Sequence, residues 1–339
     1  MTTPTSPLPS APRPLVEIRG LRTHFFTESG VARAVDGVDL DIREGEVLGL
    51  VGESGSGKSV TALSILRLIP DPPGRIVGGS ITFRGQNLLA LPLDEIRRVR
   101  GREISMVFQE PMTSLNPVFT IGMQLTEVVL AHETVSHDEA ERRAVAMLTE
   151  VGIPDAASRM TQYPHHLSGG MRQRVVIAMA LLLNPSLVIA DEPTTALDVT
   201  IQAQILDLML SLKARRAGAA ILLITHNMAV VAETCDRVAV MYGGKIQEVA
   251  PVEALFANPL HPYTRGLLAS IPRINGPKAR RLTVIPGSIP DIHSLPAGCK
   301  FETRCSERFG PCAGTEPPLI EVQPDHFVRC HLHGEASRG

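Results

Sequence analysis

Residues 52–59, Gly-Glu-Ser-Gly-Ser-Gly-Lys-Ser, constrain this chain more than any other stretch, because they match the pattern G-x-x-x-x-G-K-[ST] at each fixed position. Residues 46–51 predict a buried strand before the motif, and residues 59–69 after it carry apolar side chains at helical spacing until Pro70. In this order the glycines let the backbone approach phosphate oxygens, while the loop amides and the helix N-terminus attract negative charge. A glycine-rich turn with a chance lysine does not explain that context. We therefore predict a nucleotide-binding site.

Two side chains of the motif have expected roles. The Lys58 ammonium is expected to reach the β- and γ-phosphates, and the Ser59 hydroxyl is expected to ligate Mg²⁺. Phe25 and Phe26 precede the motif, and either ring could stack on adenine, although packing of an edge strand explains them equally well. The candidate ATP-binding residues are Phe26, Gly52, Glu53, Ser54, Gly55, Ser56, Gly57, Lys58, Ser59 and Val60.

Composition narrows the class of protein. The chain has 339 residues, enough for two domains, and its 44% apolar content supports a sizeable core. A net charge of −2 provides no basic field, so nucleic acid is not an expected partner. Residues 1–14 predict a disordered leader, and the longest apolar runs, such as residues 219–224, are too short to span a bilayer. We expect a soluble, cytosolic chain whose membrane role comes through partners.

The apolar pattern predicts an α/β fold. Strands are expected at residues 15–19, 38–42, 46–51, 79–83, 104–108, 187–191, 220–225, 238–242 and 245–249. Helices are expected at residues 59–69, 93–102, 138–151, 175–183 and 201–212. The continuous apolar run that ends at Asp191 and Glu192 is typical of a central parallel strand.

Four candidate groups stand at or just after predicted strand ends, namely Lys58, Gln109, Glu192 and His226. Each has an ordinary structural explanation alone, but ligands of open α/β sheets bind at the carboxyl ends of the strands, where these groups would meet. Asp191 is placed to hold Mg²⁺, and Glu192 is placed to polarise the water that attacks the γ-phosphate.

Residues 167–174, Leu-Ser-Gly-Gly-Met-Arg-Gln-Arg, lead into a strongly apolar helix. A Ser-Gly-Gly cap exposes amides at a helix N-terminus, which makes a second candidate anion site, although a plain helix cap explains it too.

Together these motifs resemble those of the ATPase subunits of ABC transporters. Gln109 matches the glutamine that follows the phosphate loop in that family, and Asp191 with Glu192 matches its acidic pair. Residues 196–198 match the D-loop and His226 the switch histidine. Residues 167–170 match the LSGGQ signature, with Met171 where the family usually has Gln. The resemblance implies that Glu192, His226 and Gln109 are catalytic and that Ser59, Gln109 and Asp191 hold Mg²⁺. It also implies that Ser168, Gly169, Gly170 and Gln173 face ATP bound to a second, partner subunit.

Several segments are similar to one subfamily, the oligopeptide/dipeptide importer ATPases. These segments are residues 108–117, 163–170, 258–268 and 285–291, the last followed by four cysteines. The implied fold is a P-loop NTPase with a helical subdomain at about residues 110–185, and a small loop-rich extension that contains cysteines. The ATPase domain would span residues 15–250 and the extension residues 251–339.

The resemblance implies a motor that hydrolyses ATP in a head-to-tail dimer, most simply with a homologous but distinct ATPase. That dimer would drive two transmembrane permeases and, through them, an extracytoplasmic substrate-binding protein, from the cytoplasmic face of the inner membrane. Residues near 109–124 would contact the permeases. Peptides are the expected cargo, with nickel or another small solute as the alternative. A soluble ABC ATPase acting on nucleic acid and a subunit with a dead site are the competing classes, but the chain lacks tandem units and keeps Lys58, Glu192 and His226.

The tail cysteines, Cys299, Cys305, Cys312 and Cys330, have the spacing C-x₅-C-x₆-C-x₁₇-C. Disulfides are disfavoured in a reducing cytosol, and buried thiols are disfavoured because the surrounding segment offers little apolar core. Spacing alone leaves a zinc site and an iron–sulfur cluster open. The subfamily resemblance points to a [4Fe–4S] cluster with a structural role. Cys235 lies apart from these four and is expected to be an ordinary core thiol.

Overall fold

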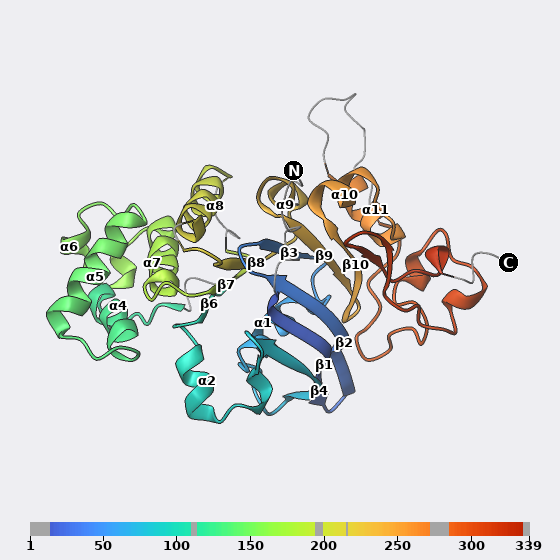
Figure 1. Cartoon of the computed structure of the whole chain (residues 1–339), viewed down its shortest axis with the longest axis horizontal. Helices are drawn as coiled ribbons and strands as arrows, with labels where there is room; N and C mark the ends of the chain where they lie inside the picture. Colours follow the sequence, from blue (N-terminus) through green and yellow to red (C-terminus); the bar gives the residue numbers. More distant parts are fainter. Residues whose placement is uncertain (1–13, 110–113, 194–198, 215, 272–284, 335–339) are drawn as a thin grey trace, which may run out of the picture.

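The computed structural model describes residues 14–109, 114–193, 199–214, 216–271 and 285–334 (Figure 1). The strands are β1 Pro14–Thr27, β2 Gly30–Arg43, β3 Val47–Val51, β4 Gly74–Phe83, β5 Gln86–Asn87, β6 Ile104–Val107, β7 Leu187–Asp191, β8 Ala220–Thr225, β9 Arg237–Tyr242, β10 Lys245–Pro251, β11 Ile320–Gln323 and β12 His326–Val328. The helices are α1 Lys58–Ile65, α2 Leu93–Val99, α4 Ile121–Leu130, α5 His137–Glu150, α6 Ala156–Arg159, α7 Gly169–Leu181, α8 Val199–Ala214, α9 Met228–Thr234, α10 Val252–Ala257 and α11 Pro262–Ala269.

The larger sheet has the strand order β11-β12-β10-β9-β3-β8-β7-β6. The five strands from β9 to β6 pair in parallel, and β10, β12 and β11 add antiparallel strands at one edge. Every residue of β3, β7 and β8 is buried, because both faces of these strands are covered, one by helices and the other by α1 and the antiparallel strands β1, β2 and β4. Strands buried on both faces favour uninterrupted apolar sequences. The predicted α/β fold with a parallel core is confirmed.

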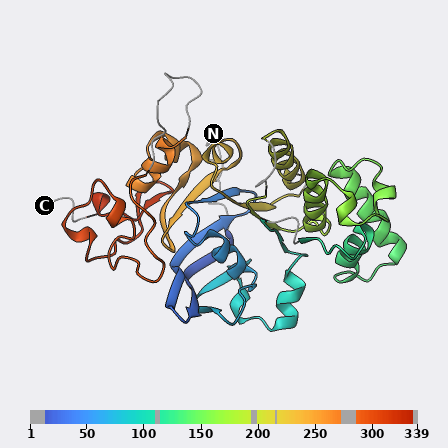
Figure 2. The same ribbon diagram turned by 180° about the vertical axis from the view of Figure 1, so that it is seen from behind.

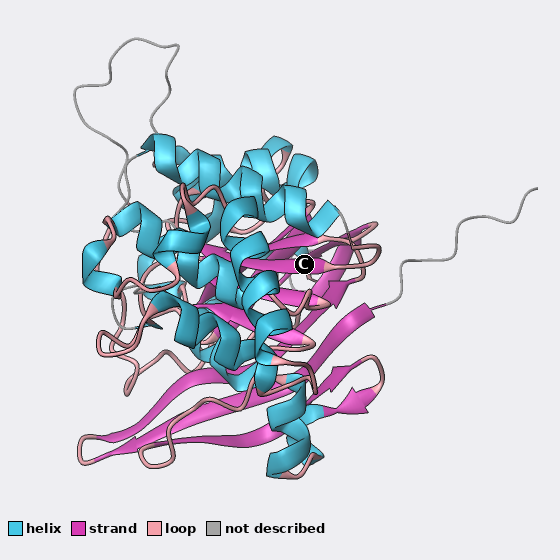
Figure 3. Ribbon diagram, turned by 90° about the vertical axis from the view of Figure 1, so that its left-hand side faces the viewer, coloured by secondary structure: helices cyan, strands magenta, loops and turns pink. Residues whose placement is uncertain are grey.

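A second, antiparallel sheet has the order β2-β1-β4-β5 and packs against one face of the first through a shared apolar cluster, to which Ile18 and Leu48 belong (Figure 3). Its β1–β2 hairpin has two 14-residue strands, far longer than the predicted segments 15–19 and 38–42. Register shifts at four places along β1 keep the two strands paired where the simple alternation of apolar and polar residues stops. Phe25 and Phe26 therefore lie within the last part of β1, opposite Ala32 and Val31 and just before the hairpin turn.

Helices α4 to α7 form the outlying helical region at the left of Figure 1. Ala140, Ala144 and Leu148 of α5 are buried at the helical spacing that the sequence predicts. Helix α7 begins at Gly169, six residues before the predicted start, because the Ser168 hydroxyl caps the helix by accepting a hydrogen bond from the Met171 amide at 3.3 Å. Among the described residues, no helix combines the length and apolarity needed to cross a bilayer.

The C-terminal extension packs beside β10 and supplies β11 and β12 to the main sheet (Figure 2). Glu248 of β10 is fully buried and accepts hydrogen bonds from the amides of Leu260 at 2.7 Å and His261 at 2.9 Å, while His326 Nε2 lies 2.8 Å from its Oε1. Burial alone would raise the pKa of Glu248, but the hydrogen bonds from His326 and from the two amides oppose that effect, and the pKa is lowered. One buried carboxylate thus joins the extension to the sheet.

Candidate nucleotide-binding site

The phosphate loop turns tightly between β3 and α1. Gly52 and Gly57 have φ values of 151° and 107°, which side chains rarely adopt. A Cβ atom at Gly52 would lie 2.1 Å from the Met241 carbonyl oxygen, and one at Gly57 would lie 2.3 Å from the Ala34 carbonyl oxygen. The loop therefore needs glycine at both places because neighbouring backbone touches it.

Lys58 is buried at the start of α1, as its predicted role requires. Its Nζ donates hydrogen bonds to the carbonyl oxygens of Gly52 at 2.8 Å and Glu53 at 3.0 Å. Burial lowers the pKa of Lys58, while the negative charges of Glu192, Asp191 and Glu53 oppose that shift. The ammonium is thus held inside the loop, close to carboxylates that a bound nucleotide would meet.

Asp191 ends β7 next to Ser59. Burial raises the pKa of Asp191, and a hydrogen bond with the Ser59 hydroxyl and the Lys58 charge act against that shift. The Asp191 Oδ1 atom is buried and has no hydrogen-bond partner within the described part of the chain. A buried carboxylate oxygen without a partner beside a hydroxyl suits a hard cation such as Mg²⁺, whose preferred ligands are oxygens.

Gln109, Glu192 and His226 come together, as the sequence predicts. Gln109 Nε2 donates to Glu192 Oε2 at 3.3 Å, and His226 Nδ1 lies 3.3 Å from Glu192 Oε1. The Glu192 side chain is 16% exposed and that of His226 is 66% exposed. The parallel register of β6, β7 and β8 causes this meeting, because it aligns the strand ends from which the three residues follow.

Residues 168–170 form the second predicted anion site. Ser168 and Gly169 are exposed and Gly170 is half-buried, so the N-terminus of α7 is open to a partner. Gln173 differs from the prediction, because its side chain is 1% exposed and donates to the Pro193 carbonyl oxygen at 2.5 Å. Gln173 therefore points into its own subunit and does not face a partner's ATP.

The other predicted ATP ligands are placed as follows. Ser54 and Gly55 are exposed, Ser56 is buried, and Glu53, Ser59 and Val60 are half-buried. Phe26 is 50% exposed, whereas the Phe25 ring lies against Gly74, so Phe26 has the freer ring face. Residues 110–113 and the D-loop, residues 196–198, lie outside the described residues.

The four tail cysteines line a single small cavity of about 10 Å³. All four are free thiols, and Cys299, Cys312 and Cys330 are buried. The sequence argument against buried thiols is therefore wrong, because Phe301 packs edge-on against Tyr242 at a ring distance of 5.3 Å and provides the missing core. Among the described residues, no group of three or more His, Cys, Asp or Glu side chains is arranged to hold a metal ion.

Burial raises the pKa of Cys299 to about 11 and that of Cys330 to about 12, and the nearby thiols add to both shifts. Cys235 is also buried, away from this cavity, and burial raises its pKa to about 12, as expected for a core thiol.

A groove of about 660 Å³ lies between β6 and helices α4 and α7. Gln124 fixes the loop at its edge, since its Oε1 accepts from the Asn116 amide at 2.9 Å and its Nε2 donates to the Phe119 carbonyl oxygen at 3.1 Å. The adjoining surface is apolar, with Val118 70% and Met123 56% exposed.

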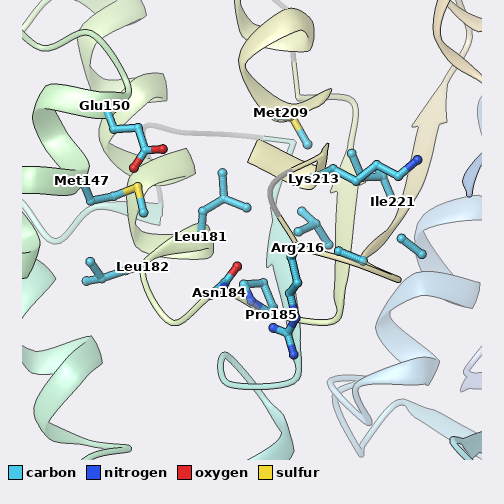
Figure 4. Close-up of a pocket in the computed structure, with 13 residues that line it drawn as sticks. Met147, Glu150, Leu181, Leu182, Asn184, Pro185, Met209, Lys213, Arg216 and Ile221 are labelled. Atoms are coloured by element: carbon cyan, nitrogen blue, oxygen red, sulfur yellow. The ribbon is translucent and has the colours of Figure 1, made fainter. Parts of the chain in front are cut away.

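Figure 4 shows a different cavity, of about 240 Å³, which is lined mainly by residues of α5, α7 and α8 and of the loops that follow α7 and α8. Met147, Leu181 and Met209 form part of its apolar wall, and Lys213 and Arg216 add two cations. None of the predicted nucleotide-site residues lines this cavity.

Comparison with known proteins gives concordant matches. Residues 35–195 match the family model described as ABC transporter, and residues 247–312 match the model of the oligopeptide/dipeptide transporter C-terminal region. A probable peptide ABC transporter ATP-binding protein from Sinorhizobium fredii is 53% identical over 95% of this chain and 96% of its own length. The oligopeptide transport ATP-binding protein AppD of Bacillus subtilis is 51% identical over 95% of this chain and 97% of its own length.

The dipeptide transport ATP-binding protein DppD of Bacillus subtilis is 47% identical, with 95% of each chain covered. Among solved structures, a dimeric ATP-binding cassette bound to ADP and phosphate matches with a TM-score of 0.62 and 27% identity, covering 70% of this chain and 98% of the other.

The geometry predicts opposite outcomes for two substitutions. Lys58→Ala should abolish nucleotide binding, because Lys58 is the cation held within the phosphate loop. Glu192→Gln should preserve nucleotide binding but lower turnover by at least about 100-fold, since it removes the candidate base. Binding and hydrolysis are to be measured for both variants in the assembled complex. An undiminished rate for Glu192→Gln would show that Glu192 is not the base.

Proposed function

The chain belongs to the family of ABC transporter ATP-binding proteins and is an ATPase, and from this premise we propose that it is the motor of a peptide importer. The observation that carries the proposal is the meeting of Gln109, Glu192 and His226 beside the phosphate loop. The names of the relatives, together with the C-terminal match, support peptides as cargo. Nickel or another small solute is the alternative cargo.

In the proposed mechanism the phosphate loop binds the nucleotide and Phe26 stacks on adenine. Lys58 exchanges its loop carbonyl partners for the β- and γ-phosphates. Ser59, Gln109 and Asp191 would hold Mg²⁺, which when bound supplies positive charge to the phosphates. Glu192 orients and deprotonates the attacking water, while Gln109 and His226 hold its carboxylate in place.

We further propose that the site is completed by a second ATPase subunit. Ser168 and Gly169 offer exposed amides at the start of α7, and this helix packs against β6, α4 and α5. The phosphate loop leads instead into α1, which packs against β1, β2 and β7. Two helix N-termini in separate parts of one chain suit two different nucleotides in a head-to-tail dimer. The proposed partner is a homologous but distinct ATPase.

The groove beside Gln124 is the proposed docking site for the permeases, at the cytoplasmic face of the membrane. Phe108, which directly precedes Gln109, lines the groove, so a permease segment seated there would lie close to the contact between Gln109 and Glu192. The extracytoplasmic binding protein would act through the permeases.

Met123→Glu tests this coupling. A carboxylate on the exposed apolar surface should weaken assembly with the permeases and lower peptide uptake by at least about ten-fold, while nucleotide binding by the chain is retained. Leu93→Glu is the matched control, because Leu93 is similarly exposed, at 51%, but lies on α2 and not on the apolar surface of Val118 and Met123 that adjoins the groove. Co-purification with the permeases and uptake in proteoliposomes are the measurements. Normal assembly and uptake for Met123→Glu would exclude this docking site.

We propose that residues 251–339 form a separate extension and that its four cysteines bind a [4Fe–4S] cluster, with zinc as the alternative. Four thiols that line one cavity, beside His261, His331, Glu302 and Glu307, include the donor set that such clusters use. Because burial raises the pKa values of Cys299 and Cys330, these side chains are neutral thiols at neutral pH. A bound cationic centre would be needed to stabilise the thiolates that ligate a metal. The role proposed for the cluster is structural.

Metal analysis after anaerobic purification tests the cluster. The protein should be brown and contain about four iron atoms and about four acid-labile sulfides per chain. Cys305→Ser should lower both contents, since Cys305 lines the cavity. Cys235→Ser is the control, because that thiol lies outside the cavity. Stoichiometric zinc without sulfide would decide for zinc.

A further inference from the structure

The C-terminal extension reaches the phosphate loop through one arginine. Arg304 Nη1 donates to Glu53 Oε2 at 2.6 Å, and its Nη2 donates to Glu53 Oε1 at 3.1 Å. This paired geometry is the strongest form of an arginine–carboxylate contact. Glu53 is the second residue of the phosphate loop, 251 positions earlier in the chain.

Arg304 is held rigidly. Its side chain is 4% exposed, its Nε donates to the Pro286 carbonyl oxygen at 3.0 Å, and its Nη1 donates to the Tyr242 hydroxyl at 3.3 Å. The guanidinium also lies 5.9 Å from the centre of the Phe301 ring. Because these partners fix the guanidinium, its position is set by the extension together with Tyr242 of β9, and not by the phosphate loop.

A second contact anchors the same loop residue through its backbone. The Glu53 amide donates to the Tyr263 hydroxyl at 2.8 Å. Tyr263 belongs to α11 and is fully buried, with its ring 4.7 Å from that of Tyr242. Side chain and backbone of Glu53 are thus both bound by elements that follow β8 in the chain.

The negative charge of Glu53 links its contact with Arg304 to nucleotide binding. A carboxylate inside a loop that binds phosphates repels them unless a cation compensates it. The Glu53 carbonyl oxygen also accepts a hydrogen bond from Lys58. A shift of Glu53 would therefore disturb both the electrostatic potential of the loop and the position of its lysine.

We propose that Arg304 is a positioning residue of the nucleotide site: by holding Glu53 and neutralising its carboxylate, the extension sets the affinity of the phosphate loop for nucleoside triphosphates. The proposal rests on the proposed function only in requiring that the loop binds ATP. Arg304 directly precedes Cys305, so the cysteine-lined cavity and the loop are joined across one peptide bond. Loss of structure at that cavity would then weaken nucleotide binding.

The test is a double-mutant cycle in the full chain, with equilibrium binding of a fluorescent ATP analogue as the readout. Arg304→Met should raise the Kd by about ten-fold or more, because it leaves the Glu53 carboxylate unpaired. Glu53→Gln in the Arg304→Met background should recover most of that loss, since it removes the uncompensated charge. Arg308→Met is the control, because Arg308 is in the same extension, exposed, and paired with Glu302.

The outcomes separate the possibilities. Recovery by the second substitution, with an unchanged Kd for Arg308→Met, supports electrostatic positioning. A double variant as weak as Arg304→Met, or a wild-type Kd for Arg304→Met, overturns the proposal. If the wild-type chain itself fails to bind the analogue in the presence of Mg²⁺, the proposed ATPase function is wrong, and the proposed role of Arg304 is wrong with it.

Discussion

The parallel pairing of five fully or largely buried strands is the constraint on which the rest of this structure depends. β3, β7 and β8 contain no exposed residue, so slipping their register would cost burial on both faces of the sheet. The same register aligns their carboxyl ends. Lys58, Glu192 and His226 follow those ends. Their proximity is therefore a consequence of how the buried strands pack, and not of contacts among the three side chains.

The phosphate loop is confined from two directions. On one side, backbone of β2 and β9 lies so close that Gly52 and Gly57 admit no side chain. On the other side, the extension contacts Glu53 through Arg304 and Tyr263. A loop that is already shaped when the nucleotide arrives loses less entropy on binding, which favours affinity. The extension is in this sense part of the site, although it contributes none of the motif residues.

The local pattern of apolar and polar residues predicts the strands in which every residue is buried. The ends of β7 and β8 agree with the sequence prediction, because continuous apolar runs leave little choice of boundary. The alternating pattern predicts a β1 that is too short, because the register shifts of this strand interrupt the alternation of apolar and polar residues. Gln173 was misplaced by motif resemblance, although helical spacing aligns it with the buried Val176 and Ile177.

Contacts between distant segments were beyond any local pattern. Arg304 pairs with Glu53, and Cys299 and Cys312 are buried in the same apolar cluster as Tyr242. Each contact joins parts of the chain that no sequence spacing relates.

The completion of the site by a second subunit is tested most directly by the ATPase rate per chain, measured from dilute isolated chain to the complex assembled with the permeases and the second ATPase. The exposed amides at Ser168 and Gly169 predict that the rate is low for the isolated chain and rises steeply on assembly. A chain that hydrolyses ATP at the full rate as a strict monomer would contradict a site shared between two subunits.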